Sequence, residues 1–131
     1  MPERPDPEAT PWVDGQTVGG VLRATAARFP GRDAVIFPAA GIRWTWSELD
    51  RRVDATASGL LRQGVQPGAH VGIWSMNCPE WVVAQFAVAR IGAVLVHVNP
   101  AYRRHELEET LRQADVDTLI VGTPYKTSDF V

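Results

Sequence analysis

From Thr45 to Val121 the chain alternates predicted helices with predicted strands, and this alternation limits the fold more than any other feature. The strands are the short apolar runs at 70–75, 93–98 and 118–121. Helical apolar spacing fills the segments before and between them, at 46–63, 79–91 and 104–114. Such an order is typical of a parallel sheet with helices on its faces and right-handed crossovers. We therefore predict an α/β fold.

Local signals define the first two helices. "TWSE" is a capping box, in which the Thr45 hydroxyl accepts from the amide of Glu48 and the Glu48 carboxylate reaches back. The helix that follows ends at Gly64, and its predicted buried stripe is Leu49, Val53, Ala57, Leu60 and Leu61. An earlier helix follows Thr17 as its N-cap. The predicted buried face of that helix is Val18, Val21, Leu22, Ala26 and Phe29.

Two short β-rich runs lie between these helices, at 34–37 and 42–46 around "PAAG", and predict a β-hairpin. Side chains alternate across a strand, so Trp44 and Trp46 should point to one face of the hairpin. We interpret both indoles as sheet packing rather than as a platform for a ligand.

The chain divides into a tail and a body. Residues 1–16 form the predicted flexible, proline-rich tail, because this segment lacks the apolar periodicity that a buried element needs. Trp12 is the exception, as a candidate anchor on the body. Residues 17–131 form the predicted α/β segment.

Composition excludes several classes of protein. A net charge of -2 gives no electrostatic reason to expect nucleic acid as a partner. No apolar run approaches the roughly 18 residues of a transmembrane span, and no signal peptide is visible. The single cysteine, Cys78, cannot form an intrachain disulfide, which fits a cytoplasmic location.

Self-contained chemistry is not evident in the motifs. There is no G-x-G-x-x-G, no Walker-type phosphate loop and no G-x-S-x-G elbow. His70, His97 and His105 lie on different elements without metal-ligand spacing, so we predict no metal site. Cys78 or Asn77 caps the helix that begins near Pro79, and we interpret the thiol as structural. Three glutamates are interpreted as solvated surface charges, with one ion pair from Glu108 to Arg112: Glu106, Glu108 and Glu109.

Ligands of parallel α/β sheets gather at the carboxyl ends of the strands. Three loops follow those ends here: "SMNCPE", "NPAYRR" and "GTPYKTSD". Any function of this chain should therefore involve these loops. We predict no catalytic residue in them.

Four motifs in order carry a family resemblance: "TWSEL", "GVQPGAHVGI", "NCPEW" and "ARIGAVLVHVNPAYRRHELE". Together they make 17–131 similar to the N-terminal segment of the AMP-forming acyl-CoA synthetases, in the adenylate-forming superfamily. "NPAYRRHELE" followed by "YKTSDF" most resembles the fatty-acyl-CoA ligase branch, and within it the medium-chain group.

The resemblance implies a partial flavodoxin-like sheet plus a hairpin, the first part of the large N-terminal domain of such enzymes. It also implies that the parent enzyme uses ATP, Mg²⁺ and CoA to convert a fatty acid first into acyl-AMP and then into acyl-CoA. The family's phosphate loop and adenylation lysine have no counterpart in these residues. We therefore expect a truncated fragment that is inactive alone and holds no cofactor.

The resemblance also suggests where CoA is bound. Some relatives carry an arginine after the "NP" turn that contacts the CoA nucleotide, but this chain has Ala101 there, and Arg103 and Arg104 are the nearby substitutes. Other relatives place a basic residue in the loop after the third strand, where this chain has Lys126. The alternative interpretation is that all three are ordinary solvated charges.

A different class of function is also open, that of a free-standing flavodoxin-like binding domain without catalysis. Such a domain has about five parallel strands, whereas three are predicted here. An incomplete sheet leaves apolar surface exposed, so we expect self-association through a sheet edge or the apolar faces of the 79–91 helix.

Overall fold

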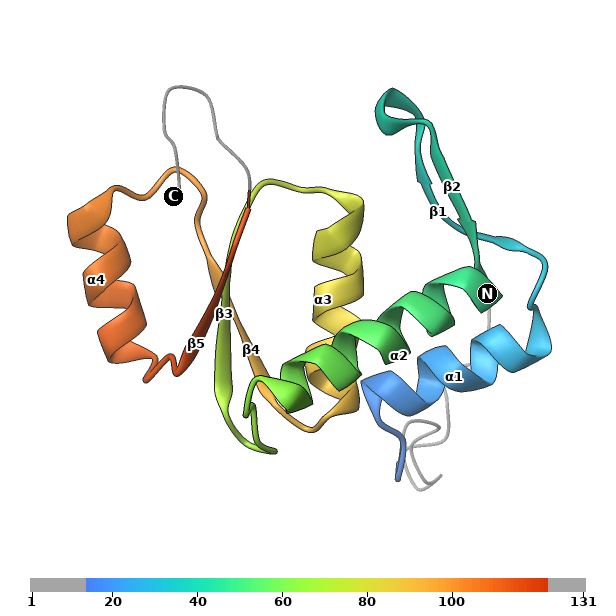
Figure 1. Ribbon diagram of the computed structural model, residues 1–131, viewed down its shortest axis with the longest axis horizontal. Helices are drawn as coiled ribbons and strands as arrows, with labels where there is room; N and C mark the ends of the chain where they lie inside the picture. The colour runs from blue at the N-terminus through green and yellow to red at the C-terminus, as the bar shows by residue number, and fades with distance from the viewer. Residues whose placement is uncertain (1–13, 123–131) are drawn as a thin grey trace, which may run out of the picture.

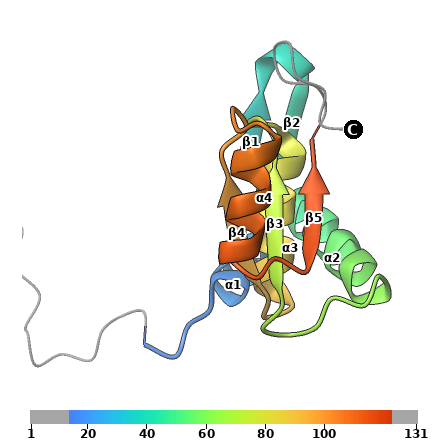
Figure 2. The same cartoon turned by 90° about the vertical axis from the view of Figure 1, so that its left-hand side faces the viewer.

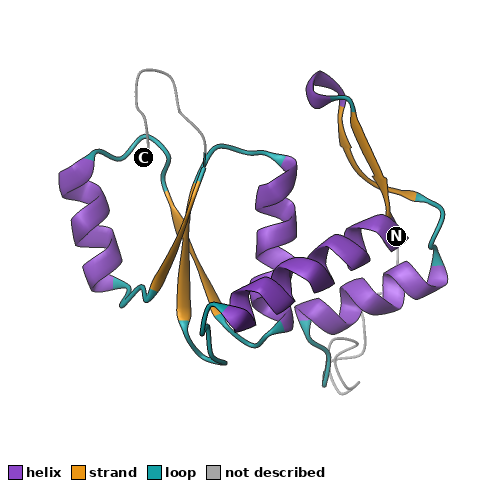
Figure 3. Cartoon of the chain, in the orientation of Figure 1, coloured by secondary structure: helices purple, strands orange, loops and turns teal. Residues whose placement is uncertain are grey.

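The computed structural model describes residues 14–122 of the chain (Figures 1 and 3). In chain order the elements are α1 (Val18–Arg28), β1 (Asp33–Phe37), the 3-10 turn η1 (Pro38–Ala40), β2 (Ile42–Thr45), α2 (Trp46–Arg62), β3 (His70–Trp74), α3 (Pro79–Arg90), β4 (Val94–Val98), α4 (Arg104–Gln113) and β5 (Thr118–Val121).

A three-stranded parallel sheet forms the centre of the body, in the order β4-β3-β5. Val71 of β3 pairs with Leu95 on one side and with Thr118 on the other. Helix α4 covers one face of this sheet, and α3 covers the other (Figures 1 and 2). The predicted α/β class with a partial parallel sheet is therefore confirmed.

Helices α1 and α2 pack on α3, on the side away from the sheet, and the β1–β2 hairpin packs on α2 (Figure 1). The hairpin is antiparallel, with Val35 opposite Trp44. One core cluster joins α1, α2 and the hairpin to α3, and its members are Leu22, Val35, Trp44, Leu49, Val53, Ala57, Val83 and Ala87. A smaller cluster between α3 and the sheet contains Val65, Val71 and Val88.

The predicted capping box at the start of α2 is confirmed. The Thr45 amide donates to Glu48 Oε2 at 2.8 Å, and the Glu48 amide donates to Thr45 Oγ1 at 3.2 Å. The bond from the Thr45 backbone lowers the pKa of the Glu48 carboxyl below its ordinary value. Gly64 follows the C-cap of this helix with a positive φ of 91°, as predicted for a C′ glycine.

The predicted buried face of α1 is partly wrong. Val18 is 57% exposed and Val21 is 42% exposed, whereas Gly19, Leu22 and Ala26 are buried. Apolarity alone could not identify Gly19 as a core position. The backbone of α3 comes so close that a Cβ on Gly19 would lie 3.1 Å from the Cα of Arg90. In α2 the same correction applies to Leu61, which is half exposed.

Trp46 also differs from the prediction. It is the first residue of α2 rather than the last of a strand, so the alternation of side chains ends at Thr45. Trp44 is buried with the Arg52 guanidinium 4.2 Å above its ring. Trp46 instead lies with Val21 and Phe86 at a different groove. The two indoles therefore serve different contacts.

The predicted pair from Glu108 to Arg112 is replaced by two others on α4. Arg104 Nε donates to Glu108 Oε1 at 2.7 Å, and Arg112 Nη1 donates to Glu109 Oε2 at 2.6 Å. Glu108 has Arg104 one turn before it and Arg112 one turn after it, and it pairs with Arg104. The surface position of these charges is as predicted.

Most of the predicted tail, including Trp12, lies outside the described residues, so that interpretation stays a prediction. Among residues 14–122, no helix combines the length and apolarity that crossing a membrane requires.

Candidate functional site

The carboxyl ends of the three strands bring the predicted loops to one edge of the sheet (Figure 1). Two hydrogen bonds tie these ends together. The Gly122 amide, just after β5, donates to the Trp74 carbonyl at 2.9 Å. The indole of Trp74 in turn donates to the Asn99 carbonyl after β4 at 3.1 Å. Position along the sequence alone did not reveal this role of Trp74.

The turn after β4 is ordered by Asn99. Its side-chain oxygen accepts from the Ala101 amide at 2.9 Å, and its carbonyl accepts from the Tyr102 amide at 3.0 Å. These bonds form an Asx-type turn that leads into α4. The Arg103 amide then donates to Glu106 Oε2 at 3.1 Å. The backbone at Arg103 is thus held at this edge of the sheet.

The structure places two of the three predicted CoA-binding residues side by side, at the start of α4. The Arg104 side chain is 92% exposed and is hydrogen-bonded to Glu108. This bond raises the pKa of Arg104 and lowers the pKa of Glu108. A phosphate at Arg104 would have to compete with that carboxylate. The third residue, Lys126, lies outside the described residues.

A pocket of about 410 Å³ opens beside the end of β5 and the start of α3. It is lined by Ile73, Ser75, Cys78, Glu80, Trp81, Ile120, Val121 and Gly122. A second pocket of about 480 Å³ shares Glu80 and Ile120 with it and extends along α2. Residues of β3, α3 and β5 line the first pocket, and β2 and α2 contribute to the second, so sequence reasoning did not find them.

Gly122 is the residue at this pocket whose type the structure requires. A Cβ on this residue would overlap the Ser75 hydroxyl and would lie 3.0 Å from the Cα of Ser75. Real Cβ atoms do not approach so closely, so the loops after β3 and β5 can meet only because residue 122 has no side chain.

Cys78 occupies the N-cap of α3, but its side chain makes no capping hydrogen bond. Its Sγ lies 3.8 Å from the Ser75 hydroxyl. The predicted capping position is correct, although the thiol itself does not accept from the helix.

The three histidines are dispersed, as expected. His70 Nδ1 lies 2.6 Å from the Ala114 carbonyl, and the His97 ring meets Trp81 edge-on at 4.9 Å between centroids. No group of three or more metal-ligating side chains occurs within 14–122. The described edge therefore combines exposed cations at the start of α4 with a pocket beside the end of β5.

Comparison with known proteins identifies the family. The model of the AMP-binding enzyme family matches residues 22–130. Over 114 residues the chain is 45% identical to YngI of Bacillus subtilis (strain 168), which its name gives as a candidate acyl-CoA synthetase. Over 118 residues it is 39% identical to the mitochondrial medium-chain acyl-CoA ligase ACSF2 of Danio rerio.

These alignments cover 87% and 90% of this chain but only 21% and 20% of the two relatives. The chain therefore spans about a fifth of their length. The solved structure of a Mycobacterium tuberculosis fatty acyl CoA synthetase superposes with a TM-score of 0.80 at 25% identity, over 82% of this chain and 22% of that one. Sequence and fold agree, and the chain belongs to the family of AMP-binding enzymes.

Proposed function

We propose that these residues form the N-terminal part of an AMP-forming fatty-acid–CoA ligase. In the proposed reaction a carboxylate attacks ATP, with Mg²⁺, to give an acyl-adenylate and pyrophosphate. The thiol of CoA then displaces AMP to give the thioester. The observation that carries this proposal is the family match over 22–130, together with relatives named as acyl-CoA synthetases or ligases. A medium-chain acid is the proposed substrate, since one relative is named for it.

Within that reaction we assign this segment two roles, as scaffold and as part of the CoA site. Arg103 and Arg104 begin α4 at the edge where ligands of parallel sheets gather. Arginine suits a phosphate as a planar fork and lysine suits it as a point charge, so the set of Arg103, Arg104 and Lys126 fits the nucleotide phosphates of CoA. For Mg²⁺ no described cluster of ligands exists, so no metal chemistry is assigned to residues 14–122.

The competing function was a free-standing flavodoxin-like binding domain. It is not favoured, because the family model and both relatives align with nearly the whole chain as part of an enzyme. The sheet also has an open edge at β5 among the described strands, next to the two joined pockets.

Two further properties belong to the proposal. We place the enzyme in the cytoplasm, in line with a lone cysteine at position 78. We also propose that the 131-residue chain self-associates through the β5 edge and the neighbouring surface of α3. Val121 at this edge is 38% exposed, and an open strand edge readily pairs with another chain.

The test is ATP–pyrophosphate exchange with the whole polypeptide that carries these residues, using short-, medium- and long-chain saturated acids. The expected result is exchange that is strongest with medium-chain acids, and thioester formation when CoA is added. The 131-residue chain assayed alone should show no exchange, since it contains no phosphate-binding glycine motif. Exchange without any thioester would overturn the ligase assignment. Strongest exchange with a short- or long-chain acid would overturn only the proposed length of the substrate.

A further inference from the structure

Helix α4 lies on one face of the sheet, and its first turn belongs to the proposed CoA site (Figures 1 and 2). None of its ten residues is buried, and Leu107 and Leu111 are only partly covered. A helix with so little buried apolar surface is held weakly by its own packing. The place of its first residues therefore depends on the turn that leads into it from β4.

Trp74, the last residue of β3, lies on the face of the sheet that α4 covers. Side chains alternate along a strand, so Trp74 projects to the same side as a side chain at Gly72 would. A Cβ on Gly72 would lie 3.6 Å from Cδ2 of Leu111 in α4. Trp74 is only 8% exposed, and its backbone pairs with Val98 on one side and Val121 on the other. The indole thus projects from a backbone that the sheet holds on both sides.

The indole fixes the turn after β4 to the sheet. Its Nε1 donates to the Asn99 carbonyl at 3.1 Å, within the usual range for an N–H···O bond. The same carbonyl accepts from the Tyr102 amide at 3.0 Å, and the Asn99 side chain accepts from the Ala101 amide at 2.9 Å. These last two bonds shape the turn from within and would keep its form wherever it lay. The bond from Trp74 sets where the turn, and Arg103 just after it, lies relative to the sheet.

We propose that Trp74 is a positioning residue for CoA: by holding the turn after β4, its indole N–H places the cations of Arg103 and Arg104. This role rests on the proposed function, and it acts through the turn rather than by contact with CoA. Groups that bind a ligand must be held within about 0.5 Å of the productive geometry. A turn that loses its bond to the sheet should therefore bind the phosphates of CoA less well, while the chemistry that precedes CoA is unchanged.

Trp74→Phe in the whole polypeptide that carries these residues tests the proposal. The variant removes the donor, and the Asn99 carbonyl keeps its bond from the Tyr102 amide, so that acceptor is not left unpaired. The KM for CoA should rise about three- to tenfold, while ATP–pyrophosphate exchange, which does not involve CoA, should keep the wild-type rate. Trp44→Phe is the matched control, because Trp44 is also 8% exposed but lies in the hairpin. It should leave the KM for CoA unchanged.

Further measurements separate a positioning role from a merely structural one. Benzothienylalanine at position 74, in which sulfur replaces the indole N–H, removes the hydrogen bond but keeps the size of the ring, and it should raise the KM for CoA as Trp74→Phe does. In a background of Arg103→Ala and Arg104→Ala, Trp74→Phe should raise the KM no further, because the groups that it positions are gone. Hydrogen exchange in peptides that cover 99–104 should be faster in Trp74→Phe and unchanged in Trp44→Phe.

The outcomes distinguish this role from the proposed function. If wild type forms no thioester, or if Arg103→Ala and Arg104→Ala together leave the KM for CoA unchanged, the proposed ligase or its CoA site is wrong and Trp74 loses this role with it. If the arginine variants act as expected but the KM is unchanged in Trp74→Phe, or rises equally in the alanine background, the positioning role alone is overturned. Loss of pyrophosphate exchange in both variants at position 74 would make Trp74 a structural residue, which also overturns the proposal.

Discussion

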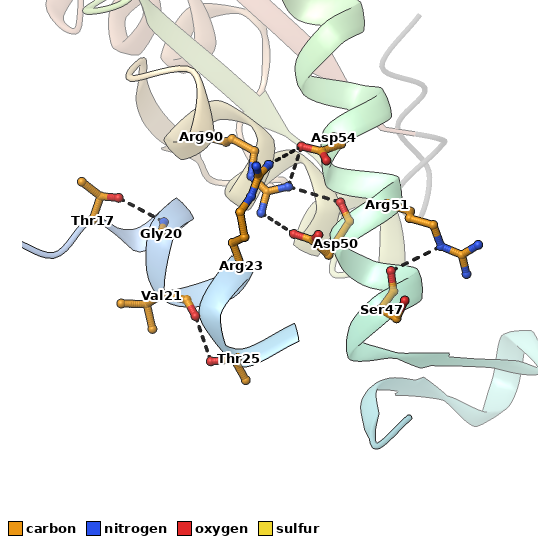
Figure 4. Close-up of polar contacts among 10 residues, drawn as sticks. All are labelled: Thr17, Gly20, Val21, Arg23, Thr25, Ser47, Asp50, Arg51, Asp54 and Arg90. Carbon is orange, nitrogen blue, oxygen red and sulfur yellow. Dashed lines mark hydrogen bonds and ion pairs between the residues drawn. The ribbon is translucent and has the colours of Figure 1, made fainter. Parts of the chain in front are cut away.

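Arg90 of α3 holds Asp50 of α2 through both the side chain and the backbone. Its Nη2 donates to Asp50 Oδ1 at 2.6 Å, and its Nη1 donates to the Asp50 carbonyl at 3.2 Å (Figure 4). Nη1 also donates to Asp54 Oδ1 at 2.8 Å. Arg23 Nη2 of α1 donates to the same oxygen, also at 2.8 Å. The Arg90 side chain is only 10% exposed. One shielded guanidinium therefore links α3 to α2, and Asp54 extends the link to α1.

Arg90→Ala should destabilise the chain by about 3 kcal/mol, because two carboxylates would lose a shielded partner. Arg23→Ala is the matched control. It removes a bond of equal length to the same Asp54, but from a side chain that is 60% exposed, so its cost should stay below about 1 kcal/mol. Urea unfolding of both variants measures the difference. Equal losses would mean that burial does not set the strength of this network.

The capping box predicts a specific pH dependence. The folded-state pKa of Glu48 is lowered, mainly by the bond from the Thr45 amide, so its contribution to stability is fully present above the ordinary glutamate pKa of the unfolded chain. That contribution is lost as pH falls through the lower folded value. The stability difference between wild type and Glu48→Gln should therefore shrink from about pH 6 to about pH 3. A difference that stays constant over this range in thermal unfolding would contradict the assignment.

Gly122→Ala should destabilise the carboxyl edge by on the order of 1–3 kcal/mol, because the new methyl group overlaps Ser75. Ser75→Gly in the same chain should restore part of the loss. As a control, Gly59→Ala in α2 meets no atom closer than 4.0 Å and should stabilise by about 0.5–1 kcal/mol, through helix propensity. Denaturant titration of wild type, Gly122→Ala, Ser75→Gly and the double variant gives the coupling, and additive effects would rule out the proposed contact.

The proposed CoA site predicts a selective kinetic effect in the whole enzyme. Lys126→Ala or Arg103→Ala should raise the KM for CoA several-fold, by a loss on the order of 1 kcal/mol, and the effect should weaken in salt. The adenylation half-reaction should not change, because CoA is not yet involved. Dephospho-CoA lacks the ribose 3′-phosphate. If that phosphate is the partner of these cations, the KM for dephospho-CoA should be the same in wild type and variant.

Arg62→Ala serves as the control for that experiment, since this exposed arginine ends α2, outside the three loops of the proposed site. If Lys126→Ala and Arg103→Ala both leave the KM for CoA unchanged at low salt, these cations are ordinary surface charges and the segment is scaffold.

Self-association is expected for the 131-residue chain in sedimentation experiments. Val121→Lys should weaken it, because a charge on an exposed edge strand opposes pairing with another chain. Val94→Lys places the same charge on β4, at the opposite edge of the described sheet, and should have little effect. A monomer at all concentrations would contradict this proposal without affecting the enzymatic assignment.

The sequence by itself determined the features that depend on neighbours along the chain. The capping box of Thr45 and Glu48, the hairpin and the order of helices and strands all follow from local hydrogen bonding and apolar period. The family could also be recognised, because its motifs are local strings. Arg103 and Arg104 were placed at the ligand edge for the same reason, since strand ends are visible in the sequence.

Tertiary structure decided which side chains are covered and which partners meet. Gly19 rather than Val18 faces the core, where the backbone of α3 lies so close that a Cβ on Gly19 would be 3.1 Å from the Arg90 Cα. Arg90 meets Asp50 forty residues away, and Trp74 at the end of β3 meets Asn99 at the end of the neighbouring strand β4. These contacts depend on how helices and strands pack against one another in space. The apolar period within one helix or strand does not show which other element lies next to it.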